Sequence, residues 1–292
     1  MAKIKISEVF FSLQAEGLYV GVPSIFIRTF GCNFKCAGFG IPKGDKLSTI
    51  ADDVALQRKD HPEWTIETLP LAKTGCDSYF SWHPKFKDMS PTMDIEQIIH
   101  EVEMARLIYQ PNGPRNGLKD SHIVITGGEP LLGWQKSYPA LLDKLAETGY
   151  RHITFETNGT QKICDEFADY LLLNHINGKR LNITFSVSPK LPCSREKLSK
   201  ALQPNIITDY MKYGKVYLKF VIANQHDLDD VNEFVHGYKA AGYFGEVYLM
   251  PLGGTVDDYM FNSPQVAALA MHSGYRYSPR LQVDLWGNKT GT

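Results

Sequence analysis

Three of the five cysteines lie in the stretch from Gly31 to Trp82, each next to residues that let the backbone turn. They are Cys32, Cys36 and Cys76. Three thiolates leave a metal centre with one open coordination position, which separates a catalytic site from a structural one. The spacing therefore predicts an iron–sulfur cluster in this stretch. Cys164 and Cys193 have ordinary neighbours and are expected to be packing or loop residues.

Two features of the cysteine stretch bear on this interpretation. Cysteine and histidine both suit zinc, so a structural zinc site with His83 as the fourth ligand stays open as an alternative.

The 39 residues between Cys36 and Cys76 contain several glycines and prolines and a polar middle. A structureless connection of this length is uncommon and usually functional. We expect a surface insertion at about 38–74, with a short helix within 49–58.

The rest of the chain alternates strand patterns with helical patterns. Strands are predicted at 24–29, 121–126, 152–156, 181–187, 216–222 and 247–250, after an extended segment at 4–12. Helices are predicted at 92–107, 138–148, 163–173, 228–241 and 264–272, followed by a short strand at 281–285. This alternation implies parallel strands joined by right-handed crossovers. About six such strands are too few for a closed eight-stranded barrel. We therefore expect an α/β fold, a partial (open) TIM-like barrel with flanking helices.

In such a barrel, chemistry gathers at the carboxyl ends of the strands. The predicted strand ends repeatedly carry glycine, proline and polar residues. These ends are Arg28, 126–130, 156–158, 188–190, 222–224 and 250–252. Because the strands are parallel, we expect these ends to line one shared pocket on one face of the barrel.

Composition narrows the class of protein further. The chain has 292 residues, 43% of them hydrophobic and 22% charged, which suits a single domain spanning 1–292. A net charge of −1 gives no electrostatic footprint of nucleic-acid binding. There is no apolar run of membrane-spanning length and no apolar signal-peptide block at the N-terminus. Five cysteines, an odd number, suit a reducing compartment, so we expect a cytoplasmic protein.

Several short blocks resemble those of the radical S-adenosylmethionine enzymes, in which three cysteines hold a 4Fe–4S cluster. The blocks are Cys-x3-Cys at 32–36, the later Cys76, and Gly-Gly-Glu-Pro at 127–130. Within that superfamily the sequence is similar to the 7-carboxy-7-deazaguanine synthases of the queuosine pathway. This narrower resemblance rests on blocks at 12–17, 28–32, 76–82, 126–130, 156–159, 188–190 and 286–289, in the family's order.

The chain departs from this family in two places. The superfamily usually has its third cysteine three positions after the second, where this chain has Phe39. The residues that normally follow the third cysteine instead follow Cys76, which indicates an insertion inside the cluster loop. Ala15 stands where the family's Gln-Gly-Glu has glycine, and its methyl group is expected to tighten the pocket or alter the turn.

The resemblance implies a role for each matching residue. The cluster ligands would be Cys32, Cys36 and Cys76, and the hydroxyl of Ser78 would ligate Mg2+. The substrate would be bound by Leu13, Gln14, Ala15, Glu16, Arg28, Thr126 and the C-terminal carboxylate of Thr292. S-adenosylmethionine would be bound by Gly128, Glu129, Ser188, Pro189, Lys190, Met250 and Pro251. The resemblance implies no catalytic side chain beyond the cluster and the cofactor.

The resemblance also implies the reaction and the partners. The reduced cluster would cleave S-adenosylmethionine to methionine and a 5′-deoxyadenosyl radical. That radical would take a hydrogen from 6-carboxy-5,6,7,8-tetrahydropterin, and ring contraction with loss of ammonia would give 7-carboxy-7-deazaguanine. A flavodoxin or ferredoxin would be the electron donor, and the protein would be a homodimer. Two alternatives stay open: a radical activase acting on a partner enzyme, and a catalytically disabled homologue with a binding or regulatory role.

Overall fold

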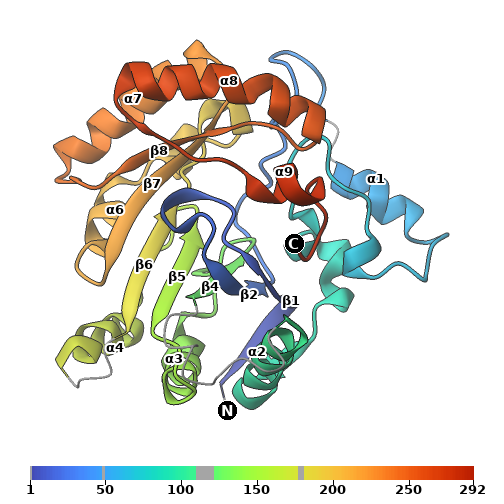
Figure 1. Ribbon diagram of the computed structural model, residues 1–292, viewed down its shortest axis with the longest axis vertical. Helices are drawn as coiled ribbons and strands as arrows, with labels where there is room; N and C mark the ends of the chain where they lie inside the picture. The colour runs from blue at the N-terminus through green and yellow to red at the C-terminus, as the bar shows by residue number, and fades with distance from the viewer. Residues whose placement is uncertain (1, 48–49, 110–121, 177–180) are drawn as a thin grey trace.

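A curved β-sheet organises the chain in the computed structural model, which describes residues 2–47, 50–109, 122–176 and 181–292 (Figure 1). Its strands, counted over these residues, follow the order β3-β1-β2-β4-β5-β6-β7-β8-β9. They are β1 Lys3–Leu13, β2 Pro23–Thr29, β3 Thr92–Asp94, β4 His122–Gly127, β5 His152–Thr157, β6 Asn182–Val187, β7 Lys215–Ile222, β8 Val247–Pro251 and β9 Arg276–Tyr277. β1 pairs antiparallel with β2 and β3, and the pairings from β2 to β9 are parallel. The sheet ends on two different strands, so the predicted open barrel is confirmed.

Most helices lie on the outer face of this sheet, whereas α1 and α9 lie away from that face (Figure 1). The helices are α1 Ile50–Gln57, α2 Ile95–Tyr109, α3 Tyr138–Glu147, α4 Asp165–Ile176, α5 Leu198–Ala201, α6 Pro204–Tyr210, α7 Gln225–Ala240, α8 Val256–Ser273 and α9 Leu281–Trp286. The short α5 and α6 were not predicted. Within the described ranges, no helix combines the length and the hydrophobicity that crossing a bilayer requires.

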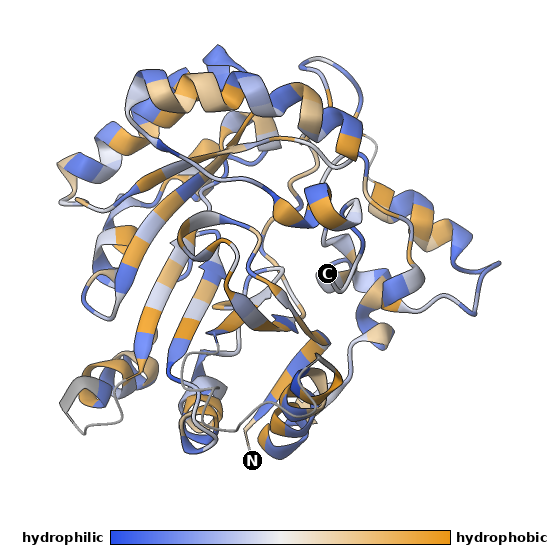
Figure 2. Ribbon diagram, viewed as in Figure 1, coloured by the Kyte–Doolittle hydropathy of each residue, from blue (hydrophilic) through white to orange (hydrophobic). Residues whose placement is uncertain are grey.

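The parallel strands alternate between a helix-facing side and an inner side. Ile153 and Phe155 of β5 are fully buried in the main hydrophobic core, which also contains residues of α3 and α4. Thr154, between them, points inward, where its hydroxyl lies 2.6 Å from Nε2 of His122 on β4. Glu156 follows on the same inner side and lines the cavity described below. Figure 2 shows this alternation along β5 and β6. The pleat therefore sends every second residue toward the interior of the barrel.

The C-terminal part of the prediction is wrong in two places. Residues 281–285, predicted as a strand, belong to α9, and Gly287 ends this helix in the left-handed conformation at φ 62°. The alternation of three apolar residues there resembled a strand pattern, but only Val283 of α9 is buried. Helix α8 begins at Val256 instead of 264, because the Thr255 side chain caps it by accepting from the backbone N–H of Asp258.

The predicted helix start at 92–94 is also wrong. These residues form β3, which pairs with β1, and α2 begins only at Ile95. Asp94 nevertheless caps this helix, because its Oδ1 accepts from the backbone N–H of Gln97 at 2.9 Å. The Gln97 side chain accepts from the Asp94 N–H in return, which forms a reciprocal capping box. Position 49, where the range predicted to contain a short helix begins, lies outside the described residues. Position 121, where a predicted strand begins, lies outside them as well.

The segment between Cys36 and Cys76 packs with the residues that follow Cys76 in a second hydrophobic cluster. It is built from Ala51, Val54, Ile66, Leu69, Ala72, Tyr79, Phe80 and Phe86. Helix α1, predicted within 49–58, contributes Ala51 and Val54 to this cluster and stands beside the barrel (Figure 1). The cluster explains how a long interval with many glycines and prolines keeps a defined shape, since burial of apolar surface offsets part of its conformational entropy.

Two substitutions in α1 test whether this cluster stabilises the protein. Val54 is 2% exposed and Leu56 is 64% exposed on the same helix. We expect Val54→Ala to lower the free energy of unfolding by about 1–3 kcal/mol, because it leaves a cavity. Leu56→Ala, the matched control, is expected to change it by less than about 0.5 kcal/mol. Urea unfolding followed by circular dichroism measures both, and equal stabilities of the two variants would contradict a packed core here.

Candidate functional site

The carboxyl ends of the parallel strands open onto one cavity of about 840 Å³. Its wall includes residues from five of the six predicted strand ends, namely Arg28, Thr126, Glu156, Ser188 and Met250. The sixth predicted end, 222–224, does not line the cavity, and its strand contributes Lys219 and Val221 instead. Most of the predicted strand ends therefore share one pocket.

Cys32, Cys36 and Cys76 line this same cavity. They belong to one small cluster with Phe34, Phe39 and Ala201, in which Cys36 is buried. Cys164 and Cys193 pack instead against the main hydrophobic core, which agrees with the packing role expected for them. The fold thus brings together the three cysteines that the sequence singled out, although 39 residues separate the second from the third.

The Gly-Gly-Glu-Pro turn after β4 seats the first cysteine. The carbonyl of Gly31 accepts from the backbone N–H of Glu129 at 2.7 Å. A Cβ atom at Gly128 would lie 2.4 Å from that carbonyl oxygen and 2.7 Å from Cys32 Cβ. Only glycine therefore allows the two loops to approach this closely. The Glu129 side chain is fully buried and accepts from the Thr157 hydroxyl at 2.7 Å, which ties β4 to β5.

Cys36 takes a conformation that is uncommon for a residue with a side chain. Its φ is 49°, in the left-handed region. One carboxylate oxygen of Glu196 accepts from the N–H groups of both Lys35 and Cys36, each at 2.7 Å. Glu196 was not predicted, because it lies 160 positions further along the chain and only the fold brings it to Cys36.

The interval between the second and third cysteines begins and ends at the same place. The N–H of Gly75 donates to the carbonyl of Phe39 at 2.8 Å. Phe39, at the position where the third cysteine was expected from the family, packs in the cluster of cysteines. Cys76 therefore follows directly after the closing contact, and its sulfur lies 3.5 Å from the Ser78 hydroxyl.

Burial keeps the three thiols neutral in the absence of a metal. It raises the pKa of Cys32 to about 12, and it also raises the pKa of Cys36 and of Cys76. The positive charge of Lys190 opposes this rise in the pKa of Cys32 and Cys36. The Lys190 amino group donates to Ser188 Oγ at 3.1 Å, which holds the charge on this side of the cavity.

The three thiols line one cavity but do not surround a single metal-ion position. In the described part of the chain, no three His, Cys, Asp or Glu side chains are placed to hold one metal ion. A 4Fe–4S cluster takes each thiolate on a different iron, so its ligands stand around a body of atoms. His83, the fourth ligand of the zinc alternative, instead bonds Asp52 at 3.1 Å and packs against Phe86. The structure therefore contradicts that zinc site.

A second set of polar residues surrounds Glu156 on the inner side of β5. Gln14 Nε2 donates to one oxygen of this carboxylate at 3.1 Å, and the Thr126 hydroxyl donates to the other at 2.9 Å. Gln14 and Thr126 were predicted to bind substrate, and the structure brings them together. No role was predicted for Glu156, although an acidic residue near the end of an apolar strand was a signal for one.

Arg28 reaches the cavity from β2. Its Nε donates to the carboxylate of Glu8, and its guanidinium lies 5.9 Å from the ring centre of Phe10 and 5.8 Å from that of Phe80. Burial disfavours the charge, but the carboxylates of Glu8, Asp77 and Glu156 together outweigh it, so the pKa of Arg28 is raised. The side chain therefore brings a permanent positive charge to the wall of the cavity.

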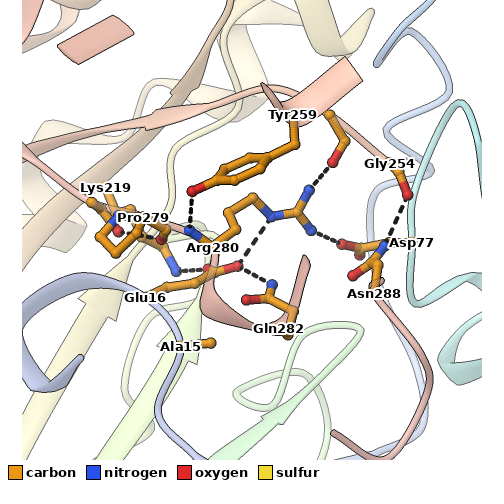
Figure 3. A network of polar contacts seen from close by, with 12 residues as sticks. Ala15, Glu16, Asp77, Lys219, Gly254, Tyr259, Pro279, Arg280, Gln282 and Asn288 are labelled. Atoms are coloured by element: carbon orange, nitrogen blue, oxygen red, sulfur yellow. Dashed lines mark hydrogen bonds and ion pairs between the residues drawn. The ribbon is translucent and has the colours of Figure 1, made fainter. Parts of the chain in front are cut away.

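Glu16 is the centre of a buried charge network (Figure 3). Its carboxylate accepts from Lys219 on β7, from Arg280 Nε at 3.4 Å and from Gln282 Nε2 at 2.7 Å. Burial opposes ionisation, but Lys219 and Arg280 prevail and lower the pKa of Glu16 to about 2. Lys219 could have been noticed in the sequence, because a lysine in the middle of a buried strand needs a partner.

The predicted site residues as a whole divide into those on the cavity wall and those behind it. Residues on the cavity wall are Leu13, Gln14, Ala15, Glu16, Arg28, Cys32, Cys36, Cys76, Ser78, Thr126, Gly128, Ser188, Lys190, Met250 and Thr292. Three predicted residues lie behind the wall. Glu129 has the buried role given above, Pro189 is buried, and Pro251 pairs with Ile222 at the end of β8.

The buried network makes stability depend on pH. The pKa of Glu16 is about 2 in the folded protein and 4.5 in its ordinary state, so its stabilisation is present above pH 4.5 and lost as pH falls toward 2. At neutral pH, Glu16→Gln is expected to lower the free energy of unfolding by about 3 kcal/mol, because it leaves Lys219 and Arg280 without their partner. This difference from the parent is expected to narrow by about 2 kcal/mol between pH 6 and pH 3. Urea unfolding at each pH measures the difference in stability between Glu16→Gln and the parent. Glu147→Gln, at an exposed position, is the control. A difference that stays constant between pH 6 and pH 3 would refute the lowered pKa of Glu16.

Gly128 offers a test of the cysteine seat. Gly128→Ala is expected to push the Cys32 loop aside, to cost about 1–3 kcal/mol of stability and to reduce iron uptake on anaerobic reconstitution. Gly237→Ala on α7 is the matched control, because a Cβ there meets nothing within 4 Å. The control is expected to stabilise the protein by about 0.5–1 kcal/mol. Normal iron content in Gly128→Ala would show that the close approach is unnecessary.

Comparisons with known proteins agree with this geometry. No family model matches the chain. The 7-carboxy-7-deazaguanine synthase of Halobacterium salinarum is 31% identical, over 99% of this chain and 93% of that protein. The 7-carboxy-7-deazaguanine synthase of Rhodopirellula baltica is 28% identical, over 100% of this chain and 90% of that protein. The crystal structure of QueE from Escherichia coli, 20% identical, superimposes with a TM-score of 0.54 over 95% of this chain and 93% of that one, which supports the fold. The chain belongs to the 7-carboxy-7-deazaguanine synthase family.

Proposed function

We propose that this chain catalyses the reaction of its family, the conversion of 6-carboxy-5,6,7,8-tetrahydropterin into 7-carboxy-7-deazaguanine with loss of ammonia. One observation carries the proposal: the three thiols and the polar set around Glu156 line the same cavity. A reactive group held by the thiols would therefore face a molecule held by the polar set. The activase alternative gains nothing from the comparisons, since both sequence relatives described above are named as synthases.

Cys32, Cys36 and Cys76 would hold a 4Fe–4S cluster at the cavity wall. When bound, this cluster and S-adenosylmethionine supply a 5′-deoxyadenosyl radical that starts the reaction. Lys190 favours the thiolate forms of Cys32 and Cys36 through its charge. Gly128, Ser188, Lys190 and Met250 would contact the cofactor from the wall, while Glu129, Pro189 and Pro251 shape that wall from behind.

The polar set would bind and orient the pterin. Glu156 would accept hydrogen bonds from ring N–H or amino groups, with Gln14 and Thr126 fixing the direction of its oxygens. Arg28 would bind the substrate carboxylate, which a guanidinium matches in a bidentate manner. Glu16 would stay ionised and supply a further acceptor, because its pKa is lowered to about 2. Leu13 and Ala15 would close the wall around the ring.

Three further assignments complete the proposal. The Ser78 hydroxyl, next to Cys76, would offer a hard oxygen to a Mg2+ ion that also holds the substrate carboxylate. Thr292, on the cavity wall, would place its carboxylate near the pterin. Residues 38–74 would be a surface insertion in one domain, which the closing contact between Phe39 and Gly75 supports. A cytoplasmic homodimer that takes electrons from a flavodoxin or ferredoxin follows from the resemblance alone.

Anaerobic reconstitution with iron and sulfide tests the proposal. The parent protein is expected to gain the visible absorbance of a 4Fe–4S cluster and, with S-adenosylmethionine and dithionite, to convert 6-carboxy-5,6,7,8-tetrahydropterin into 7-carboxy-7-deazaguanine. Cys76→Ala is expected to lose both properties, whereas Cys164→Ala, the control outside the cavity, keeps both. The product is identified by mass spectrometry.

Two results would overturn the assignment in different ways. A cluster that survives Cys76→Ala would show that another residue completes the site. A normal cluster in the parent protein, with 5′-deoxyadenosine released on a different substrate and no deazaguanine product, would support the activase alternative. A parent protein that takes up no cluster at all would support the disabled homologue.

A further inference from the structure

Arg280 joins three segments that lie far apart in the sequence. It precedes α9, and its side chain is 7% exposed. The guanidinium donates to Glu16, to Asp77 at 2.7 Å and to the carbonyl of Gly253 (Figure 3). Each of its nitrogen atoms therefore has a partner, and the three partners belong to different parts of the cavity wall.

One end of this connection is the block proposed to bind the pterin. The segment around Arg280 is fixed to that block by more than the ion pair. The N–H of Leu281 donates to the Ala15 carbonyl at 3.1 Å, and the N–H of Gly17 donates to Ser278 Oγ at 2.8 Å. The loop that carries Glu16 and the segment around Arg280 are therefore joined by hydrogen bonds as well as by the ion pair.

The other end is the segment that resumes the cysteine loop. Asp77 lies between Cys76, the proposed third cluster ligand, and Ser78. The side chain of Asp77 is 49% exposed, so packing alone holds it weakly. Its hydrogen bond to Arg280 fixes this residue to the buried network instead. The backbone of Arg280 is also anchored to α8, because its N–H donates to the Tyr259 hydroxyl at 3.2 Å.

We propose that Arg280 is a positioning residue that couples pterin binding at Glu16 to retention of the cluster at Cys76. The inference rests on the function proposed above. A bound pterin would restrict Glu16 and Arg280, so Asp77 and its neighbour Cys76 would lose less freedom on holding the cluster. Coupling between two sites is reciprocal, so the cluster would also strengthen pterin binding. In a chain whose third cysteine follows a long insertion, this contact ties the returning segment to the substrate pocket.

The rate of cluster loss to an iron chelator tests the coupling. The reconstituted protein is mixed with the chelator anaerobically, with and without 6-carboxy-5,6,7,8-tetrahydropterin, and the visible absorbance is followed. In the parent protein the pterin is expected to slow cluster loss by about 5-fold or more, the lower range of measured couplings. Asp77→Asn and Arg280→Lys are expected to reduce this protection to less than about 2-fold.

The ratio of the two rates separates coupling from simple destabilisation. A variant that is only less stable loses its cluster faster both with and without pterin. Its ratio of the rate without pterin to the rate with pterin therefore stays at the parent value. Asp77→Glu keeps a carboxylate and is expected to restore part of the protection. Arg276→Lys on β9 is the matched control, because Arg276 pairs with Glu246 at 2.7 Å on the exposed side and reaches neither site. It is expected to keep the full protection.

Three outcomes would overturn the inference. If pterin protects the cluster equally in Asp77→Asn and in the parent, the contact between Arg280 and Asp77 does not carry the coupling. Asp77 is half exposed, so this variant is expected to fold even if Arg280→Lys does not. A parent protein that turns over the pterin but shows no protection would refute the coupling and leave the proposed function standing. A parent protein that neither binds nor converts the pterin would refute both.

Discussion

The partly buried carboxylate of Glu16 constrains the positions of several segments around the site. A charge taken out of water needs partners, and here Lys219 comes from β7 while Arg280 and Gln282 come from the segment around α9. Arg280 in turn requires acceptors for the rest of its guanidinium and finds them at Gly253 and Asp77. One charge thus fixes the relative positions of the first strand's loop, the last helix and the returning end of the insertion.

Sequence alone predicted the open barrel because its main signals are local. The six central strands are apolar runs bounded by glycine, proline or polar residues, and each forms where its own residues favour it. Predictions were wrong where a local pattern suited two structures. The apolar alternation at 281–285 suited a strand, but helix α9 buries Val283 and ends at Gly287. Long-range strand pairing decided the outcome at β3, which forms beside β1.

The site was predictable to the same extent and for the same reason. Cysteines, glycines and polar strand ends stand out by type and place, and the fold brings most of them to one cavity. The residues that were missed act across long separations. Glu196 holds the backbone at Cys36, and Arg280 holds Asp77 from more than half the chain away. Nothing near either residue in the sequence marks it, because an ordinary surface glutamate or arginine looks the same.

The interval between Cys36 and Cys76 shows how two cysteines far apart in sequence can line the same cavity. Its two ends meet through the hydrogen bond between Phe39 and Gly75, so the loop leaves and returns at one point. The entropy of closing a loop grows only slowly with its length, so many added residues cost little once the ends are joined. Part of that cost is offset because residues of the interval pack against Tyr79, Phe80 and Phe86, which follow Cys76. The position of Cys76 therefore depends more on this closing contact than on the number of residues that precede it.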